Sequence, residues 1–400
     1  MRRALLILPT ATYRASDFLS AAEELGLEVV VASEEGQTLT EPFVLIDLRR
    51  PEWSAQQIVE KAGPLDAIVP VDDGGVLIAA LAAARLGLVH SRPDAVARTR
   101  NKAMLRRALF QAEVRQPAFA VLEAGDDPTE LATLVGIPCV LKPLSLSGSR
   151  GVIRVDRPQA APQVAERIRR ILAAAGENPN SPLLVESYVP GREIAVEGVL
   201  SEGRLETLAI FDKPEPLEGP FFEETIYVTP SRLHPEVLME AEAMVLEAAD
   251  AIGLDEGPVH AELRVDGSSV TFLELAARSI GGLCSRALRF GMIGASLESL
   301  LLRHALGLPT RAPEREPVAS GVMMLPIRRM GVLEQVKGVE DAKAVPGITD
   351  LQLTIPRGER LTPLPEGDRY LGFLFAKGSA PGDVEQALRL AYSKLEVVVS

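Results

Sequence analysis

A glycine-rich stretch between two apolar runs could hold a polyanion. Residues 142–151 read KPLSLSGSRG, and they lie between the strand-like runs GIPCVL and VIRV. Glycine allows backbone N–H groups to approach a phosphate closely, and a lysine supplies a compact positive charge. Lys142 is unusual because arginine supplies most of the 42 basic residues. The stretch therefore predicts either a hairpin that binds phosphate or a mobile hairpin tip with a solvated lysine.

Two carboxylates farther along the chain could bind a divalent cation. Glu262 in HAELR and Glu274 in FLELAAR occupy two successive strand-like runs joined by a glycine turn, and Arg278 follows closely. On paired strands the two carboxylates can face each other and bind Mg²⁺, which prefers oxygen ligands together with substrate phosphates. The pattern predicts a magnesium site beside those phosphates.

A third motif, VESYVPGRE, is suited to a nucleoside. It places Glu186, Val189 and Glu193 around the expected end of a strand at 184–189. If that strand continues into a linker, backbone groups near Val189 can hydrogen-bond a purine edge, and Glu193 can accept hydrogen bonds from ribose hydroxyls. Lys102 in NKAMLRRAL and Lys213 in AIFDKPEP also stand out by their positions relative to these motifs.

The elements that must position these residues begin with residues 4–90, where apolar runs alternate with amphipathic ones. Continuous apolar strands separated by helix-length segments predict a parallel sheet with helices on both faces. No G-x-G-x-x-G follows the first strand, so a dinucleotide site has no support. Asp72 and Asp73 lie where a strand gives way to a helix. There they either bind a ligand or cap the helix.

The later segments change in character. Residues 182–213 alternate apolar with polar side chains and carry turn glycines, which is typical of antiparallel strands. Helices are expected at 160–175 and 236–252. The tail after the proline-rich run GLPTRAPEREPV predicts a small α+β unit. The chain therefore combines an open parallel sheet with antiparallel units.

The composition limits the class of partner. The chain has 400 residues, of which 47% are hydrophobic, enough for several compact units with large cores. The net charge of −13 is spread along the chain, which argues against nucleic acid or an anionic membrane as the main partner. The first apolar run is short for a signal peptide, and no run approaches a membrane span. Cys139 and Cys284 make no disulfide framework, so we expect a reducing cytoplasm.

The order and spacing of these motifs resemble the ATP-grasp superfamily over residues 1–310. The resemblance implies an α/β fold of the ATP-grasp architecture. It places an N-terminal open parallel sheet with flanking helices at 1–100, two α+β ATP-binding subdomains at 101–187 and 188–310, a flap at 145–151, and a small C-terminal α+β unit at 311–400.

The resemblance also assigns roles to individual residues. The ATP ligands that it implies are Lys102, Lys142, Ser147, Gly148, Ser149, Gly151, Glu186, Val189, Glu193 and Lys213. It implies Mg²⁺, with Mn²⁺ as an alternative ion, at Glu262 and Glu274. Arg278 and Lys213 are expected to contact the phosphoryl group as it is transferred.

One position departs from the family pattern. The family reads Glu-x-Asn-x-Arg where this chain has Glu274, Ala276 and Arg278. A second Mg²⁺ ion would therefore lack a usual ligand. It would depend on Glu274, water and phosphate oxygens, or it would not bind.

The strand VHAELRV, the loop RSIGGL and the extra C-terminal unit are most similar to the L-amino-acid ligase branch, whose members join amino acids into dipeptides. We therefore expect an ATP-dependent carboxylate-amine ligase that acts through an acyl phosphate, with a small-molecule carboxylate and a small-molecule amine as substrates. Candidate substrate ligands are His260, Arg286, Asp72 and Asp73. Candidate donors to the tetrahedral oxyanion are the backbone amides of Gly281 and Gly282.

Two other functions stay open at this point. One is an ATP-grasp carboxylase or carbamoyl-phosphate type of enzyme that activates bicarbonate. The other is a nucleotide-binding protein without ligase activity, which the alanine at position 276 would suit. A homodimer is an alternative to a monomer.

Overall fold

The computed structural model describes residues 1–10, 12–34, 42–291, 294–308 and 314–400. Its strands form a four-stranded parallel sheet, a four-stranded antiparallel sheet, an eight-stranded antiparallel sheet and a three-stranded sheet. The mixed α/β architecture that the sequence predicts is confirmed. Within the described residues we find no helix with the length and apolar character needed to cross a membrane.

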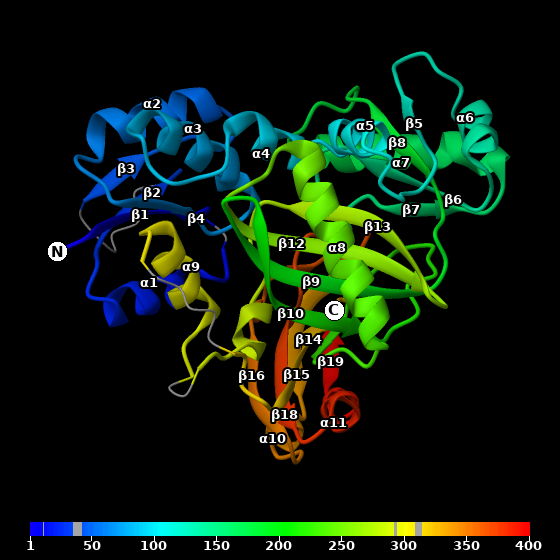
Figure 1. Ribbon diagram of the computed structural model, residues 1–400. Coiled ribbons are helices and arrows are strands. Elements are labelled where there is room, and N and C mark those ends of the chain that lie inside the picture. Colours follow the sequence, from blue (N-terminus) through cyan, green and yellow to red (C-terminus); the bar gives the residue numbers. More distant parts are fainter. Residues whose placement is uncertain (11, 35–41, 292–293, 309–313) are drawn as a thin grey trace.

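The N-terminal sheet has the order β3-β2-β1-β4, and all of its pairs are parallel. Its elements are β1 (Arg3–Ile7), α1 (Ala15–Glu24), β2 (Glu28–Ser33), β3 (Phe43–Leu45), α2 (Pro51–Lys61), β4 (Ala67–Pro70) and α3 (Val76–Leu86). Figure 1 shows α2 and α3 on one side of this sheet, and α1 with the distant α9 (Leu297–Ala305) on the other. The apolar strands are therefore covered on both faces, as predicted.

The small antiparallel sheet has the order β5-β8-β6-β7. Two helices, α4 (Pro93–Thr99) and α5 (Lys102–Gln111), lead into it. Its own elements are β5 (Phe119–Leu122), α6 (Pro128–Val135), β6 (Cys139–Pro143), β7 (Ile153–Val155), α7 (Ala161–Ala174) and β8 (Leu183–Ser187). The flap of residues 145–151 joins β6 to β7, so the predicted strand, glycine-rich turn and strand are confirmed.

The eight-stranded sheet has the order β13-β12-β9-β10-β11-β14-β18-β16. Its strands are β9 (Arg192–Ser201), β10 (Arg204–Lys213), β11 (Ile226–Thr229), β12 (Gly257–Asp266), β13 (Ser269–Ala276), β14 (Ala319–Leu325), β16 (Ile348–Leu353) and β18 (Gly372–Gly378). The helix α8 (Pro235–Ile252) packs on β9, β10 and β13. The predicted antiparallel strands over 182–213 are thereby confirmed.

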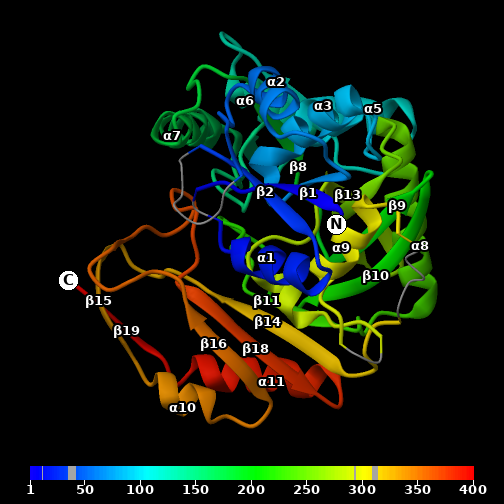
Figure 2. The same ribbon diagram turned by 90° about the vertical axis from the view of Figure 1, so that its left-hand side faces the viewer.

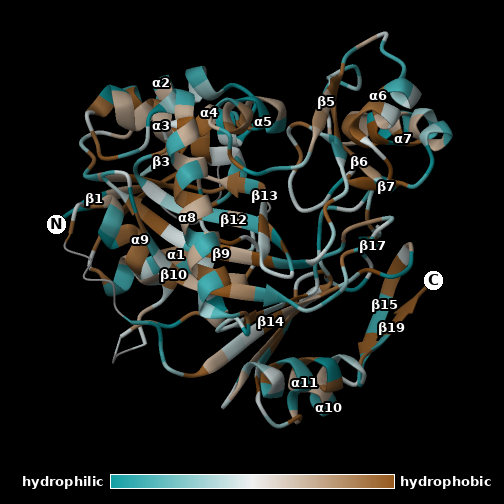
Figure 3. Cartoon of the chain, turned by 45° about the vertical axis from the view of Figure 1, so that its right-hand side comes forward, coloured by the Kyte–Doolittle hydropathy of each residue, from teal (hydrophilic) through white to brown (hydrophobic). Residues whose placement is uncertain are grey.

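This sheet continues from residues 192–276 into the C-terminal part of the chain, because β11 pairs with β14 (Figure 2). The expected boundary at residues 310 and 311 falls in a segment outside the described residues. The remaining C-terminal elements are β15 (Gly331–Lys337), α10 (Val339–Lys343), β17 (Arg360–Leu361), α11 (Pro381–Tyr392) and β19 (Glu396–Val399). Figure 3 shows both hydrophobic and hydrophilic residues on α11, which buries one face against β14 and β18.

Candidate active site

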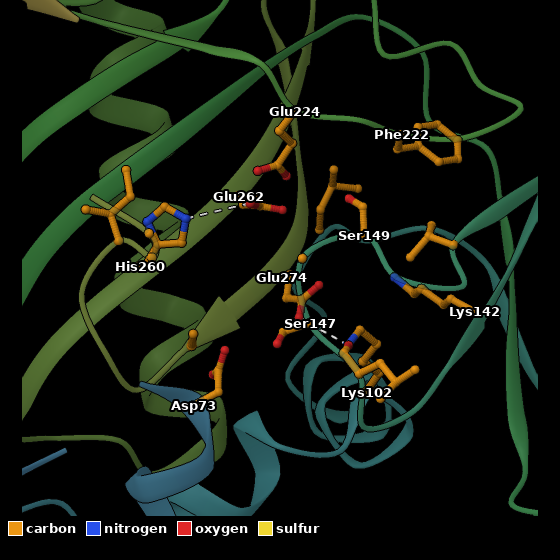
Figure 4. A pocket seen from close by; sticks show the side chains of 18 of the residues that line it. Asp73, Lys102, Lys142, Ser147, Ser149, Phe222, Glu224, His260, Glu262 and Glu274 are labelled. Atoms are coloured by element: carbon orange, nitrogen blue, oxygen red, sulfur yellow. Dashed lines mark hydrogen bonds and ion pairs between the residues drawn. The ribbon is translucent and has the colours of Figure 1, made fainter. Parts of the chain in front are cut away.

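A cavity of about 590 Å³ lies where the parallel sheet, the small sheet and the eight-stranded sheet meet. Its volume is typical of a small-molecule site. Each region contributes to its lining, for example Asp73 after β4, Ser147 in the flap, Glu262 on β12 and Tyr370 before β18. Figure 4 shows lysines and carboxylates from these separate elements pointing toward a common space.

Two of the predicted lysines line this cavity and are buried. Lys142 lies on β6, and its Nζ is 2.6 Å from Oε2 of Glu186. Burial lowers the pKa of the Lys142 ammonium, and the neighbouring Glu186 carboxylate acts in the opposite direction. Lys102 begins α5, which Asn101 caps through its side chain. The Nζ of Lys102 donates to the Leu146 carbonyl at 2.7 Å, so this lysine contacts the first part of the flap.

The flap presents small residues to the cavity. Ser147, Gly148 and Ser149 line it, and the φ angles of Gly148 and Ser149 are +64° and +56°. A backbone in this left-handed region can turn its N–H groups toward a ligand. This part of the flap has the form predicted for a phosphate-holding hairpin.

Glu186, Val189 and Glu193 of the motif VESYVPGRE also line the cavity. The carboxylates of Glu186 and Glu193 have partners in the protein. Glu186 accepts hydrogen bonds from the buried Arg106 as well as from Lys142. Glu193 lies 2.7 Å from the Lys213 Nζ and 2.9 Å from the Arg264 Nε. Val189 lies beyond the end of β8, in the connection to β9. The three residues reach the cavity as predicted, and their contacts with ATP stay a prediction.

The predicted metal-binding carboxylates lie directly opposite each other. Glu262 and Glu274 are register partners on β12 and β13, and both line the cavity. Although burial opposes ionisation, Lys213 and His260 hold the pKa of Glu262 well below its usual range. Glu274 is 35% exposed, and its Oε1 lies 3.3 Å from the Lys102 Nζ. Both side chains therefore offer carboxylate oxygens to the cavity.

This donor set suits Mg²⁺, which prefers carboxylate oxygens combined with substrate phosphates. A second group of carboxylates, Glu193, Glu224 and Glu262, has oxygen atoms within 4.8 Å of one another. The Lys213 ammonium already contacts all three of them. Binding of the ion by Glu262 together with Glu274 stays a prediction.

Arg278 and Asp73 form an ion pair of 2.9 Å at the edge of the cavity. Asp73 also lies 3.2 Å from Arg100. Burial opposes ionisation of Asp73, but these two guanidinium groups hold its pKa well below its usual range. Neither Asp72 nor Asp73 makes a side-chain capping bond to the described backbone of the following helices. The helix-capping interpretation is therefore wrong, and both residues line the cavity.

Two family models match the chain. Residues 135–287 match the ATP-grasp domain, and residues 323–400 match the L-amino acid ligase C-terminal domain 2. Residues 135–287 therefore form an ATP-grasp domain. The predicted superfamily is confirmed, and the C-terminal match agrees with the predicted ligase branch.

The chain is similar to several known proteins. Carnosine synthase 1 of Gallus gallus is 29% identical over 80% of this chain and 38% of its own length. Alanine–anticapsin ligase of Bacillus subtilis is 26% identical over 59% of this chain and 53% of its own length. The chain thus spans about half the length of these curated relatives. A solved L-amino acid ligase from Bacillus licheniformis has a TM-score of 0.80 at 24% identity, covering 100% of this chain and 99% of its own. This structural likeness shows that the two chains share a fold.

The position that departs from the ATP-grasp pattern lies inside the site. Ala276 is on β13 opposite His260, and it lines the cavity. A methyl group cannot bind a metal ion. His260 instead lies between two carboxylates, with its Nδ1 3.1 Å from Glu197 and its Nε2 3.6 Å from Glu262. His260 therefore lies beside Glu262, and its direct contact with a substrate stays a prediction.

Gly281 and Gly282 lie in the turn that follows Arg278, and their role as oxyanion donors stays a prediction. Gly281 and Gly282 line the cavity, and Gly282 has a φ of +58°. A Cβ atom at Gly282 would lie 2.9 Å from the Phe373 ring. The preceding residue, Ile280, donates its N–H to the buried Glu197 at 2.9 Å. Because glycine has no side chain, the main chain of Gly281 and Gly282 borders the cavity directly.

Three predicted site residues, Lys213, Gly151 and Arg286, are not among the described residues that line the cavity, and their ligand contacts stay predictions. Lys213 has three carboxylate partners, and an ammonium has three N–H donors. The N–H of Gly151 donates to the Pro365 carbonyl at 3.0 Å. Arg286 forms two hydrogen bonds of 2.8 Å with Asp17, and its contact with a substrate carboxylate stays a prediction.

The polar residues of the cavity that the sequence interpretation missed include Glu224, Tyr227, Asp368 and Tyr370. Glu224 accepts hydrogen bonds from the Tyr227 hydroxyl at 2.6 Å and from Lys213 at 3.0 Å. Burial and the nearby Glu262 raise the pKa of Glu224 to about 7. No recognisable motif surrounds these residues. The one available signal was the acidic pair in PFFEET, just before the strand β11.

Proposed function

We propose that this protein is an ATP-dependent carboxylate-amine ligase that acts on amino acids or similar substrates and releases ADP and phosphate. The observation that carries the proposal is the cavity itself. It brings Lys102 and Lys142 together with the facing pair Glu262 and Glu274. The L-amino acid ligase C-terminal domain supports the choice of substrate class.

The proposed reaction has two steps. A carboxylate oxygen of the acid attacks the γ-phosphorus of ATP, and ADP leaves. The nitrogen of the amine then attacks the acyl carbon, loses a proton, and expels phosphate with the transferred oxygen. Activation is needed because a carboxylate is a poor electrophile near neutral pH.

The residues of the cavity suit these steps. Lys142 and Arg278 would supply positive charge near the transferred phosphoryl group. Electrostatic stabilisation of the transition state is usually the largest single contribution to catalysis in such reactions. A divalent ion held by Glu262 and Glu274 would neutralise further phosphate charge when bound. The backbone amides of Gly281 and Gly282 are donors for the oxyanion that forms when the amine attacks.

The carboxylate of Glu224 gives the cavity a candidate ligand for a substrate ammonium. It is 17% exposed and lines the cavity, whereas Glu193 beside it is 6% exposed and paired with Arg264. An amino acid carries both an ammonium and a carboxylate. Because Glu224 lies close to Glu262, an ammonium bound by Glu224 would hold the amino acid beside the pair of Glu262 and Glu274.

A phosphate-release screen tests the proposed function. Amino acids would be supplied singly and in pairs with MgATP in bicarbonate-depleted buffer, and products would be identified by mass. We expect phosphate release that depends on a pair and equals the amount of condensed product. Release that requires only bicarbonate would instead identify a carboxylase type of enzyme. Tight ATP binding without stimulated release by any pair would contradict ligase activity.

The alanine at position 276 predicts an unusual magnesium dependence. Because Ala276 offers no ligand atom, we expect one firmly held ion and one that depends on water and ATP oxygens. The rate should keep rising with free Mg²⁺ in the millimolar range after all ATP is complexed, and Ala276→Asn should lower that requirement. A magnesium titration at fixed MgATP measures this dependence. Saturation as soon as ATP is complexed would contradict the prediction.

A further inference from the structure

A loop of the C-terminal domain, residues 362–371 between β17 and β18, reaches across to the flap. The Pro365 carbonyl accepts a hydrogen bond from the Gly151 N–H at 3.0 Å. The Glu366 carbonyl accepts one from the Arg150 Nε at 3.1 Å. The Asp368 carboxylate lies 3.3 Å from the same guanidinium. Three successive contacts therefore join this loop to the C-terminal end of the flap.

The same loop is also attached to the helix behind the flap. Glu366 forms two hydrogen bonds with Arg167 of α7, at 2.7 and 3.0 Å. This is the bidentate geometry in which an arginine and a carboxylate bind most strongly. The Arg167 guanidinium in turn lies 4.9 Å from the centre of the Phe221 ring. The loop is thereby held to the small sheet at two separate points.

The far end of the loop belongs to the cavity. Asp368 and Tyr370 line it, together with the flap residues Ser147 and Ser149. Tyr370 packs edge-on against Phe373 with ring centres 6.2 Å apart. Its carbonyl accepts a hydrogen bond from the Thr354 hydroxyl at 2.9 Å. One short segment therefore contacts both the flap and the space beneath it.

We propose that residues 362–371 are a latch that holds the flap over the cavity, with Arg150, Arg167 and Glu366 as positioning residues. The catalytic consequence rests on the proposed ligase function. Water that attacks an acyl phosphate returns the free acid and phosphate, so each such event consumes one ATP without product. A flap held by the latch excludes that water until the amine attacks. The C-terminal domain thus protects the intermediate formed in the ATP-grasp domain.

Hydrogen exchange of the flap tests the latch in the ligand-free protein. Glu366→Arg places a second cation beside Arg167, and we expect exchange in the segment 145–152 to rise about fivefold or more. The milder Glu366→Gln should give a smaller rise. The double exchange Arg167→Glu with Glu366→Arg should restore slow exchange.

A matched control is Lys337→Glu, which reverses the charge in the exposed pair between Lys337 and Glu396 on β15 and β19. This pair joins two strands of the same C-terminal domain, and we expect unchanged exchange in the flap. Normal exchange in Glu366→Arg would overturn the latch. An equal rise in the control, or no recovery in the double variant, would overturn it too.

A second measurement tests the catalytic role of the latch. For an acid and an amine that the wild-type protein joins, the ratio of released phosphate to condensed product should be close to one. It should exceed one in Glu366→Arg and return toward one in the double variant, with the thermal transition unchanged. Faster flap exchange with an unchanged ratio would overturn the protective role. If wild-type protein joins no pair, the ligase proposal fails, and the exchange measurement still decides the latch.

Discussion

Replacing Glu274 by glutamine is expected to reduce turnover by about 10²- to 10³-fold while changing nucleotide affinity far less. Glutamine has the same shape as glutamate, but it lacks the negative charge that a divalent ion needs from its ligand. That ion matters most as charge develops on the transferred phosphoryl group. Steady-state kinetics and an ATP titration of the same variant measure the two effects separately.

The control for this prediction is Glu316→Gln. Glu316 is 28% exposed and lies 2.7 Å from the Lys377 Nζ. It therefore resembles Glu274, which is 35% exposed and also has a lysine partner. Unlike Glu274, it does not line the described cavity. We expect normal turnover from this control. A Glu274→Gln protein with near-normal turnover would show that this carboxylate is not a metal ligand.

Replacing Lys142 by alanine is expected to weaken ATP binding about 10- to 100-fold, because hydrogen bonds to charged groups contribute about 1.5–3 kcal/mol. The fold should survive, since Glu186 keeps its contact with the buried Arg106. Lys142→Arg should also bind poorly, because a planar guanidinium does not replace a compact ammonium in a buried strand position. Calorimetric titration with ATP measures these affinities.

Lys377→Ala is the control for the lysine prediction. Lys377 also pairs with a glutamate, but its side chain is 39% exposed on β18 and it does not contribute to the described cavity. This variant should bind ATP normally. Wild-type affinity in both Lys142 variants would show that the lysine at the entrance of the flap does not hold the nucleotide.

Much of the fold could be predicted because its signals are local. Continuous apolar runs with helix-length separations are typical of a parallel sheet, and the glycines of residues 142–151 mark the turn between β6 and β7. The extent of the eight-stranded sheet could not be predicted in this way. It depends on the pairing of β11 with β14, two strands that are distant in sequence and carry no local sign of each other.

Some features of the site could likewise be predicted from local sequence, and others could not. Glu262 and Glu274 could be predicted because the two strands are joined by a short turn, which fixes their register. The three carboxylates that surround Lys213 could not be predicted, because the sequence gives no indication that they meet there. The ion pair of Arg286 could not be predicted for a similar reason, since its partner Asp17 comes from the N-terminal domain. Long-range ion pairs decide which charged residues stay available to a ligand.

Isotope transfer tests the central claim, that the acid is activated as an acyl phosphate, most directly. The acid of an active pair would be labelled with ¹⁸O in its carboxylate, and the phosphate released during turnover would be analysed by mass. Because the attacking carboxylate oxygen leaves with the phosphoryl group, we predict one ¹⁸O atom in the phosphate for each molecule of product. Phosphate that carries no ¹⁸O while condensed product accumulates would contradict the acyl-phosphate mechanism.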